Sequence, residues 1–262
     1  MLIRRRLPRA LVRRGVPWRT RTSLLAVAAR RRLRPVSVYE IRFGRGRLPL
    51  THEDYPVDWE TLKSIVVDRI YDVDFSDAVV LDVGSHKGYF GAFALERGAR
   101  AVISFEPESA NFRYLKRCAT TYVPSRTSWL LRRAAVGARP GAARLHVMSA
   151  SWGHSLEPPD EWAQYKVGDE QVDVVAMSDV LVEAAELAEG TSPIVVKINA
   201  EGGECSMVLG TPSASWEAVT HAFVATHPWA DCRADELAAH LERAGLRRCA
   251  SVDGDHLLRM SR

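Results

Sequence analysis

Apolar and polar positions follow two alternating patterns along this chain, and these patterns predict strands and helices in turn. Residues 79–83 are apolar at four of five positions, and a second apolar run covers 101–105. Between them, residues 89–97 have the spacing of a helix, which Gly98 ends. Strands that are apolar on both faces occur in parallel sheets covered by helices. From residue 79 onward the pattern therefore predicts a doubly wound α/β sheet.

The same alternation continues to the C-terminus. A further helix is predicted at 109–120. Strand-like runs follow it at 129–136, 143–149, 172–177, 194–198 and 219–226. Asp253, Gly254 and Asp255 separate two extended runs within 246–260, which is a hairpin signal. We expect a mostly parallel, seven-stranded sheet with a C-terminal antiparallel hairpin.

The segment before residue 79 has a weaker pattern. Residues 36–50 alternate on both sides of a glycine turn and predict a hairpin. Residues 58–71 carry an apolar stripe at helical spacing. We therefore divide the chain into an N-terminal extension over 1–35, a hairpin and helix preface over 36–78, and a main domain over 79–262.

The charge is distributed unevenly. Residues 1–47 contain 15 arginines, no lysine and one acid, Glu40, so the remaining residues carry a net charge of −10. Arginine-rich segments can bind nucleic acids or anionic lipids, but a solvated extension is the simpler interpretation. Pro8, Pro17 and Pro35 divide the segment into short pieces. We therefore predict that residues 1–35 are flexible and that deleting 1–34 leaves the melting temperature unchanged.

The spacing of the cysteines and the length of the apolar runs indicate in which cellular compartment the protein resides. The four cysteines lie far apart and form no C-x-x-C pair, which predicts neither a zinc site nor disulfides: Cys118, Cys205, Cys232 and Cys249. This favours a reduced, cytoplasmic compartment. No run approaches the roughly 18 to 20 apolar residues that cross a bilayer, so no membrane span is predicted.

A glycine-rich turn follows the first strand of the main domain, with the spacing D-x-G-x-x-x-G from Asp82 to Gly88. Glu106 ends the next strand, 24 residues beyond Asp82, where an acid accepts hydrogen bonds from ribose hydroxyls. Nicotinamide dinucleotide sites use the same acid, but they need a second glycine where this chain has His86. Asp82 would also repel phosphate. The turn therefore favours S-adenosylmethionine, which has no phosphate and a cationic amino-acid end.

Five segments, in order, carry a family resemblance: LDVGSHKGYFG at 81–91, FEPESANFRYL at 105–115, AAVGARPGAARLHV at 134–147, SWGHSL at 151–156 and VVKINAEGGE at 195–204. From residue 36 to the C-terminus the chain resembles FkbM-type S-adenosylmethionine-dependent methyltransferases. The resemblance implies the class I methyltransferase fold, which is Rossmann-like. It also implies a cofactor site formed by Asp82, Gly84, Ser85, His86, Gly88, Glu106, Asn111 and Ala135. From the turn we expect Asp82→Ala to abolish cofactor binding and to leave the fold intact.

One position departs from the family pattern. The family usually has Lys-Ile-Asp-x-Glu-Gly, whereas residues 197–202 read KINAEG, so Asn199 replaces the acid. An amide can donate and accept hydrogen bonds but is neither a base nor an anionic metal ligand. We therefore predict no metal, and we assign Asn199 and Trp152 to the substrate side.

Methyl transfer requires a positioned acceptor and, for a hydroxyl, a base. The candidate bases are His154, Glu201 and His227. Each also has a structural interpretation: His154 as an exposed loop residue, Glu201 as a helix cap, and His227 as a hydrogen-bonding residue at a strand end. Lys87 is expected to be solvated.

The sequence leaves several function classes open. We rank first the O-methylation of a small-molecule or sugar hydroxyl, of natural-product or glycan type, because of the resemblance. A non-catalytic S-adenosylmethionine-binding protein and an N-methyltransferase are the alternatives. A nucleic-acid acceptor is not expected, because the body is acidic and the D/N-P-P-[YFW] motif of DNA amino-methylating enzymes is absent; residues 157–160 read EPPD.

Overall fold

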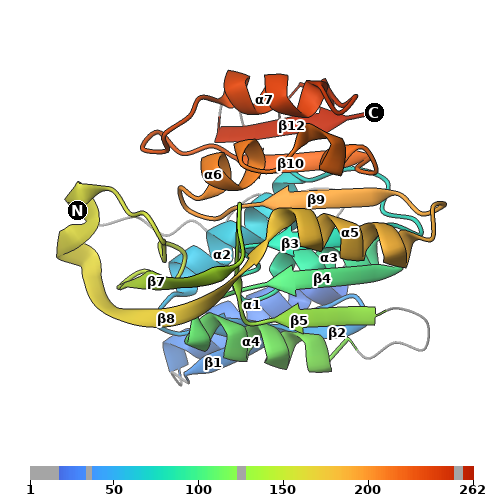
Figure 1. Ribbon diagram of the computed structural model, residues 1–262. Helices are drawn as coiled ribbons and strands as arrows, with labels where there is room; N and C mark the ends of the chain where they lie inside the picture. Colours follow the sequence, from blue (N-terminus) through green and yellow to red (C-terminus); the bar gives the residue numbers. More distant parts are fainter. Residues whose placement is uncertain (1–17, 34–36, 123–127, 251–255) are drawn as a thin grey trace.

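The computed structural model describes residues 18–33, 37–122, 128–250 and 256–262, and its centre is a seven-stranded sheet (Figure 1). The strands lie in the order β11 (Arg247–Arg248), β12 (Leu257–Ser261), β10 (His221–Ala225), β9 (Ile194–Ile198), β3 (Val79–Val83), β4 (Ala101–Phe105) and β5 (Ser128–Arg132). The strands from β10 to β5 pair in parallel, whereas β12 is antiparallel to both neighbours. The predicted sheet and its C-terminal antiparallel pair are confirmed. The turn predicted at 253–255 lies outside the described residues.

The strands β3, β4 and β9 form the centre of the sheet, and all five residues of each strand are buried. This burial explains their continuous apolar runs, because helices cover both faces. In register, Asp82 of β3 lies beside Ser104 of β4 on one side and Lys197 of β9 on the other. Polar groups from three strands therefore meet inside the sheet, near its carboxyl edge.

Helices cover both faces of the sheet, as a doubly wound fold requires. On one face the core contains side chains of α3 (Tyr89–Glu96), α4 (Ser109–Thr120) and the N-terminal hairpin. On the other face it contains side chains of α5 (Met177–Ala188), α6 (Glu204–Leu209) and α7 (Ala234–Glu242). The helices predicted at 89–97 and 109–120 are therefore confirmed to within one residue.

A second, smaller sheet is not predicted by the sequence pattern. It has the strand order β6 (Ala135–Gly137), β8 (Lys166–Ala176) and β7 (Gly141–Met148). The prediction of one strand at 129–136 is wrong, because β5 pairs with β4 only as far as Arg132, and Ala135 then pairs with Val174. An apolar run indicates that its residues are buried, but it does not show that the chain passes from one sheet to another within the run. Figure 1 shows β7 and β8 beside the ends toward which the arrows of β4, β5 and β9 point.

The preface largely follows its prediction. The strands β1 (Val38–Phe43) and β2 (Gly46–Thr51) form an antiparallel hairpin. The helix predicted at 58–71 begins earlier, as α2 (Tyr55–Lys63), because a proline in its first turn favours a helix start. It then continues as a π-helical turn (Ser64–Asp68), which Arg69 ends with a left-handed φ of 55°.

The prediction of a flexible extension over 1–35 is wrong for its second half. Residues 18–33 form the helix α1 (Trp18–Leu33), which packs on β1. Leu24 and Val27, three positions apart, are buried in the core. Pro17 precedes this helix and does not interrupt it. Pro8 and Pro35 lie outside the described residues, and the remaining domain boundaries stay a prediction.

Burial of α1 reverses the expected effect of an N-terminal deletion. Removing residues 1–34 takes Leu24 and Val27 out of the core, so we now expect the melting temperature to fall. Leu24→Ala alone should lower the free energy of unfolding by about 2 to 5 kcal/mol, the usual range for a buried leucine. Urea titration measures this loss. The exposed neighbour Leu25 provides the control, because Leu25→Ala should change the free energy by less than about 0.5 kcal/mol.

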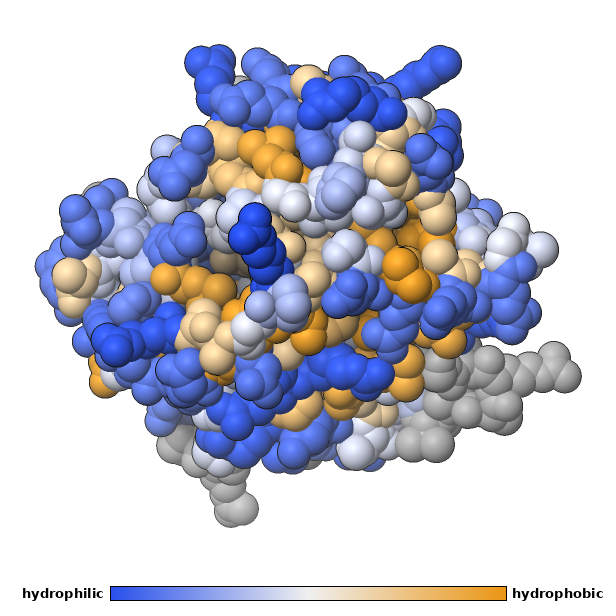
Figure 2. All heavy atoms as spheres, in the orientation of Figure 1, coloured by the Kyte–Doolittle hydropathy of each residue, from blue (hydrophilic) through white to orange (hydrophobic). Residues whose placement is uncertain are grey.

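The surface view completes the description of the fold. Figure 2 shows hydrophilic residues over most of one face, with apolar residues gathered in patches between them. Among the described residues, no helix is long and apolar enough to cross a bilayer.

Candidate functional site

A cavity of about 230 Å³ lies at the carboxyl ends of β3, β4 and β9. In chain order the sheet grows from β3 toward β5 and then resumes at β9 on the other side of β3, so the topological switch point lies at the carboxyl ends of the paired strands β3 and β9. Ligands of open α/β sheets bind at such points. Of the predicted site residues, ten line this cavity: Gly84, Ser85, His86, Glu106, Asn111, Ala135, Trp152, His154, Asn199 and Glu201.

The glycine-rich turn has the backbone conformation that its sequence predicts. Gly84 has a φ of +71°, and a Cβ at this position would collide with the carbonyl oxygen of Asn199. His86 also has a positive φ of 50°. Gly88 does not line the cavity; it precedes α3 with a φ of +90°, and a Cβ there would press on Leu115. Gly88 therefore shapes the turn from outside the cavity.

Glu106 joins this turn to the end of β4. Its Oε2 accepts the His86 N–H at 2.8 Å, and its Oε1 accepts the Glu108 N–H at 3.0 Å. Burial raises the pKa of Glu106 to about 8, despite these two hydrogen bonds. The carboxyl group is thus held by backbone donors at the cavity wall.

His86 faces the cavity with one free ring nitrogen. Its Nε2 lies 3.0 Å from the Ser151 hydroxyl, and its Nδ1 has no hydrogen-bond partner among the described residues. Burial lowers the pKa of His86 well below its usual value, so the ring is neutral. A buried nitrogen without a partner fits a ligand that supplies a hydrogen bond.

The predicted direct contact of Asp82 with the ligand is not supported. Asp82 is fully buried, does not line the cavity, and forms an ion pair with Lys197 at 3.1 Å. The Lys197 ammonium also donates to the Gly84 carbonyl at 2.6 Å and to the Val83 carbonyl at 3.3 Å. The carboxylate therefore acts through Lys197, which fixes the backbone of the turn.

The prediction that Lys87 is solvated is wrong. Its side chain is 1% exposed and pairs with Asp58 at 2.6 Å and Asp54 at 3.2 Å. It also donates to the Thr51 hydroxyl at 2.9 Å. Burial raises the pKa of Asp58 even beside this lysine. Lys87 thus connects the turn after β3 to the preface. The two segments lie some 30 residues apart, so the sequence around Lys87 does not reveal this contact.

His154 lies in the cavity wall, where its hydrogen bonds limit its chemistry. Its Nδ1 accepts the Met148 N–H at 3.0 Å, and burial lowers its pKa. The neutral ring therefore carries its proton on Nε2, which lies 3.9 Å from Glu108 Oε2. With Nδ1 engaged and Nε2 protonated, His154 can donate a hydrogen bond but cannot accept a proton without breaking the bond to Met148.

His227 lies behind the cavity, between two carboxylates. Its Nε2 is 3.4 Å from Glu201 and its Nδ1 is 3.2 Å from Glu204. Burial lowers the pKa of His227, but both carboxylates outweigh this effect and raise it to about 10. The ring is therefore an imidazolium at neutral pH, with both nitrogens protonated. It has no lone pair with which to act as a base.

Glu201 is the candidate base that retains this capacity. It lines the cavity with a φ of 48°, a strained backbone for a residue other than glycine. Its Oε1 accepts the Asn199 amide N–H at 3.3 Å, while Oε2 pairs with His227. The helix-capping role that the sequence offers for Glu201 is not observed, because α6 has no side-chain cap hydrogen bond. Glu204, the first residue of α6, instead accepts the N–H groups of Ala200 and Gly202 in the loop before the helix.

An aromatic row borders the cavity. Trp152 lines it with 45% of its surface exposed. The ring centroids of Trp152 and Trp162 lie 5.8 Å apart, and those of Trp162 and Trp229 lie 4.6 Å apart. The ring centroids of Trp229 and His227 lie 4.7 Å apart. Trp152 thus provides an open aromatic face where an acceptor could stack.

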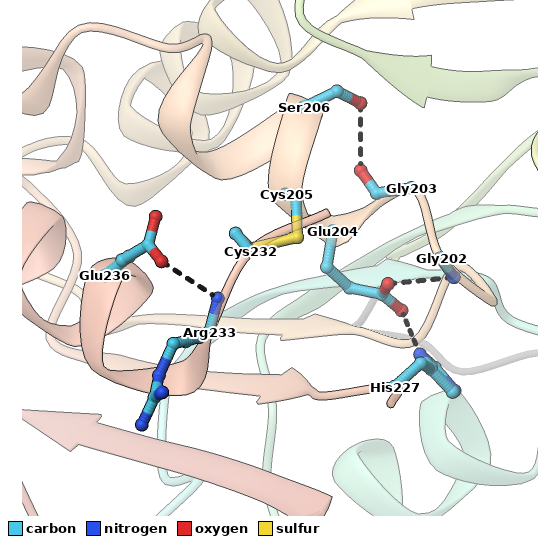
Figure 3. Close-up of a disulfide and its surroundings, with 9 residues drawn as sticks. All are labelled: Gly202, Gly203, Glu204, Cys205, Ser206, His227, Cys232, Arg233 and Glu236. Atoms are coloured by element: carbon cyan, nitrogen blue, oxygen red, sulfur yellow. Dashed lines mark hydrogen bonds and ion pairs between the residues drawn. A yellow bond between two sulfur atoms is a disulfide. The ribbon is translucent and has the colours of Figure 1, made fainter. Parts of the chain in front are cut away.

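A disulfide joins Cys205 to Cys232 beside this cluster, so the prediction of no disulfide is wrong. Figure 3 shows it next to Glu204, whose carboxylate contacts Gly202 and His227. The two cysteines are 27 residues apart, a separation that no local motif marks. Because disulfides are typical of oxidising environments, the cytoplasmic assignment loses its basis in cysteine usage and stays a prediction.

The disulfide should contribute measurably to stability. A disulfide that closes a loop of this length raises the free energy of the unfolded chain by about 3.5 kcal/mol, because it lowers the conformational entropy of that chain. We expect dithiothreitol to lower the urea midpoint of the wild type but not that of the Cys205→Ser/Cys232→Ser variant. Thiol titration of the unreduced, denatured protein should find two free thiols, Cys118 and Cys249. Four free thiols would contradict the pairing.

Comparison with known proteins gives no match to any protein-family model or curated protein. Solved structures show distant similarity. An FkbM methyltransferase from Methylobacillus flagellatus KT is 14% identical, with 78% of this chain and 50% of that chain covered and a TM-score of 0.47. A putative S-adenosylmethionine-dependent methyltransferase from Streptococcus mutans is 11% identical, with 86% and 55% covered and a TM-score of 0.42.

A putative tRNA methyltransferase from Streptococcus pneumoniae, solved with S-adenosyl-L-methionine, is 15% identical, with 77% and 70% covered and a TM-score of 0.37. This chain spans about half the length of the FkbM methyltransferase. At these identities and TM-scores the similarity identifies neither a family nor an acceptor. The fold class itself rests on the strand order and register.

Proposed function

We propose that this protein is an S-adenosylmethionine-dependent methyltransferase. The observation that carries the proposal is the buried Glu106 carboxyl, which backbone N–H groups hold at the wall of a switch-point cavity. An acid at the end of the second strand is suited to the two hydroxyls of a ribose. The absence of G-x-G in the turn disfavours a pyrophosphate.

The cavity residues divide into cofactor and acceptor sides. Gly84, Ser85 and His86 present backbone and ring atoms to the amino-acid end of the cofactor, and Glu106 holds the ribose. Asn111 and Ala135 border the adenine. Asn111 is positioned for this role because its amide donates to the Ser151 carbonyl at 2.8 Å. When bound, the cofactor supplies a methyl group on a sulfonium.

On the acceptor side, Glu201 accepts the proton of the acceptor hydroxyl. Asn199 and His227 hold its carboxylate, and the Nε2–H of His154 donates a hydrogen bond into the cavity. Trp152 stacks on the acceptor. Holding the reacting atoms in line supplies most of the rate enhancement, and a positioned base adds about 10² to 10⁴ fold.

The finer assignment is O-methylation of a small-molecule or sugar hydroxyl by an FkbM-type enzyme. A carboxylate base supports a hydroxyl acceptor, because a hydroxyl must lose its proton. An N-methyltransferase and a non-catalytic cofactor-binding protein remain the alternatives, since Asn199 replaces the acid of the family pattern. The acidic body disfavours nucleic acid as an acceptor, although one of the similar solved proteins has a name that specifies tRNA.

Glu106 gives cofactor binding a predicted pH dependence. With a pKa of about 8, the carboxyl is protonated at pH 6.5, and it loses its proton when the sulfonium and ribose bind. Affinity should therefore rise as the pH increases from 6.5 to 8. Calorimetry at pH 7 in buffers of different ionisation enthalpy should detect release of close to one proton. Glu106→Gln should abolish this release, and release from that variant would contradict the assignment.

Activity is tested with methyl-labelled S-adenosylmethionine, the full-length protein and a panel of sugars, phenols, primary amines and RNA. Label on a hydroxyl supports the proposal, and label only on amines supports the N-methyltransferase. Cofactor binding without label on any acceptor supports the non-catalytic alternative.

A further inference from the structure

A second cavity, a groove of about 580 Å³, lies between α1 and the β1–β2 hairpin. Trp18, Arg19 and Thr22 of α1 line one side, and Arg42 and Arg47 line the other. None of its residues borders the candidate active site. This basic groove is therefore a separate feature that the proposed methyl transfer does not use.

The arginines of the groove carry more positive charge than the neighbouring carboxylates neutralise. Glu40 is shared between Arg47 at 3.1 Å and Arg117 at 2.7 Å. Arg42 has no carboxylate partner within the part of the chain that the structure describes. Arg42 and Arg47 also lie directly opposite each other in the hairpin register, an arrangement of like charges that destabilises a strand pair. A bound anion would remove this repulsion.

Apolar side chains are exposed on the helix that lines the groove. Trp18 is 69% exposed and Leu25 is 48% exposed, and they lie two turns apart on one side of α1. The Arg19 guanidinium lies 5.6 Å from the centroid of the Trp18 ring. Tryptophan is enriched at membrane–water interfaces, because its ring is apolar and its N–H is polar.

We propose that the basic groove docks on an anionic lipid bilayer. Arg19, Arg42 and Arg47 bind lipid phosphates, which guanidinium groups recognise through paired N–H donors. Trp18 and Leu25 enter the interfacial layer. From Trp18 the chain continues into residues 1–17, whose sequence adds six arginines and no acid.

A lipid surface fits these observations better than a nucleic acid does. Both would bind the arginines, and Trp18 could stack on a base. Exposed Leu25, however, would gain nothing from a phosphate backbone, and residues 1–17 intersperse apolar side chains among their arginines: Leu2, Ile3, Leu7, Leu11 and Val12. Apolar and basic residues side by side match a surface that is apolar beneath its anionic headgroups.

The test is co-sedimentation of the full-length protein with phosphatidylcholine vesicles that contain either no or about one third phosphatidylglycerol. We expect binding to the anionic vesicles only, weakened by salt. Arg42→Glu should weaken it about 30-fold, because each charge near such a surface changes binding about fivefold. Arg139→Glu, an equal charge change at an exposed position in the turn between β6 and β7, is the matched control and should have a smaller effect.

The remaining outcomes each decide the proposal. The Trp18→Ala/Leu25→Ala variant should lose vesicle binding without losing stability, and full binding would overturn the proposed insertion. Equal weakening by Arg42→Glu and Arg139→Glu would show that the net charge of the protein, and not the groove, causes the binding. That result would overturn the proposal. Binding of single-stranded RNA, but not of anionic vesicles, through the same arginines would assign the groove to nucleic acid. Competition by glycerol phosphate would support recognition of the headgroup.

Discussion

Asp82→Asn should lower the free energy of unfolding by about 3 to 5 kcal/mol, the cost of leaving one partner of a buried ion pair without the other. Asp82 is fully buried and Lys197 is nearly so, and the two side chains lie 3.1 Å apart. The substitution preserves the shape of the side chain, so the loss isolates the charge. Urea titration measures it, and a loss below about 1 kcal/mol would contradict the pairing.

A double variant separates the effect of the charges from the effect of side-chain packing. In Asp82→Asn/Lys197→Met both charges are absent, so no uncompensated charge is buried, and this double variant should be more stable than Asp82→Asn alone. Cofactor affinity of the folded fraction should survive in Asp82→Asn, because Asp82 does not line the cavity. The sequence predicts the opposite, loss of cofactor binding with an intact fold. The two measurements therefore distinguish a ligand contact from a structural ion pair inside the sheet.

Glu201→Gln should lower the rate of methyl transfer by about 10² to 10⁴ fold, the contribution of a positioned base. Among the three candidates, Glu201 lines the cavity and keeps lone pairs on its carboxylate oxygens, although Oε1 accepts the Asn199 amide N–H and Oε2 pairs with His227. His227 is already protonated on both nitrogens, and the His154 ring accepts the Met148 N–H. Steady-state kinetics and calorimetry together should show a lower kcat with unchanged cofactor affinity.

Glu157→Gln is the matched control for this experiment. Glu157 is exposed, lies outside the cavity and undergoes the same chemical change. Its kcat should equal that of the wild type. If Glu201→Gln retained the wild-type kcat, proton transfer by Glu201 would be wrong. If it lost stability and cofactor binding together, the carboxylate would be structural.

Much of the fold and half of the site follow from local pattern. The strand, turn and strand that bring Gly84, His86 and Glu106 together lie within 79–106, where apolar runs and glycine spacing are direct signals. Parallel strands also place their carboxyl ends at one edge, so Asn199 and Glu201 could be assigned to the cavity from the end of β9 alone.

The missed features depend on contacts between distant segments. Lys197 meets Asp82 across 115 residues, and Cys205 meets Cys232 across 27. A strand pattern fixes which residues are buried but not which neighbour a strand has, so these pairs are hidden in the sequence. Lys87 was expected in solvent for the same reason, since Asp58 reaches it from the preface. Each of these polar groups is buried because a partner from another segment compensates its charge or its bonding.

Calorimetric titration of the full-length protein with S-adenosylmethionine and S-adenosylhomocysteine tests the central claim most directly, with NAD as the control ligand. The cavity at the carboxyl ends of β3, β4 and β9 predicts one site that binds both sulfur compounds and not NAD. Glu106→Ala should weaken both, whereas Glu157→Gln should leave both unchanged. Binding of NAD, or no binding of either sulfur compound, would contradict the proposed function.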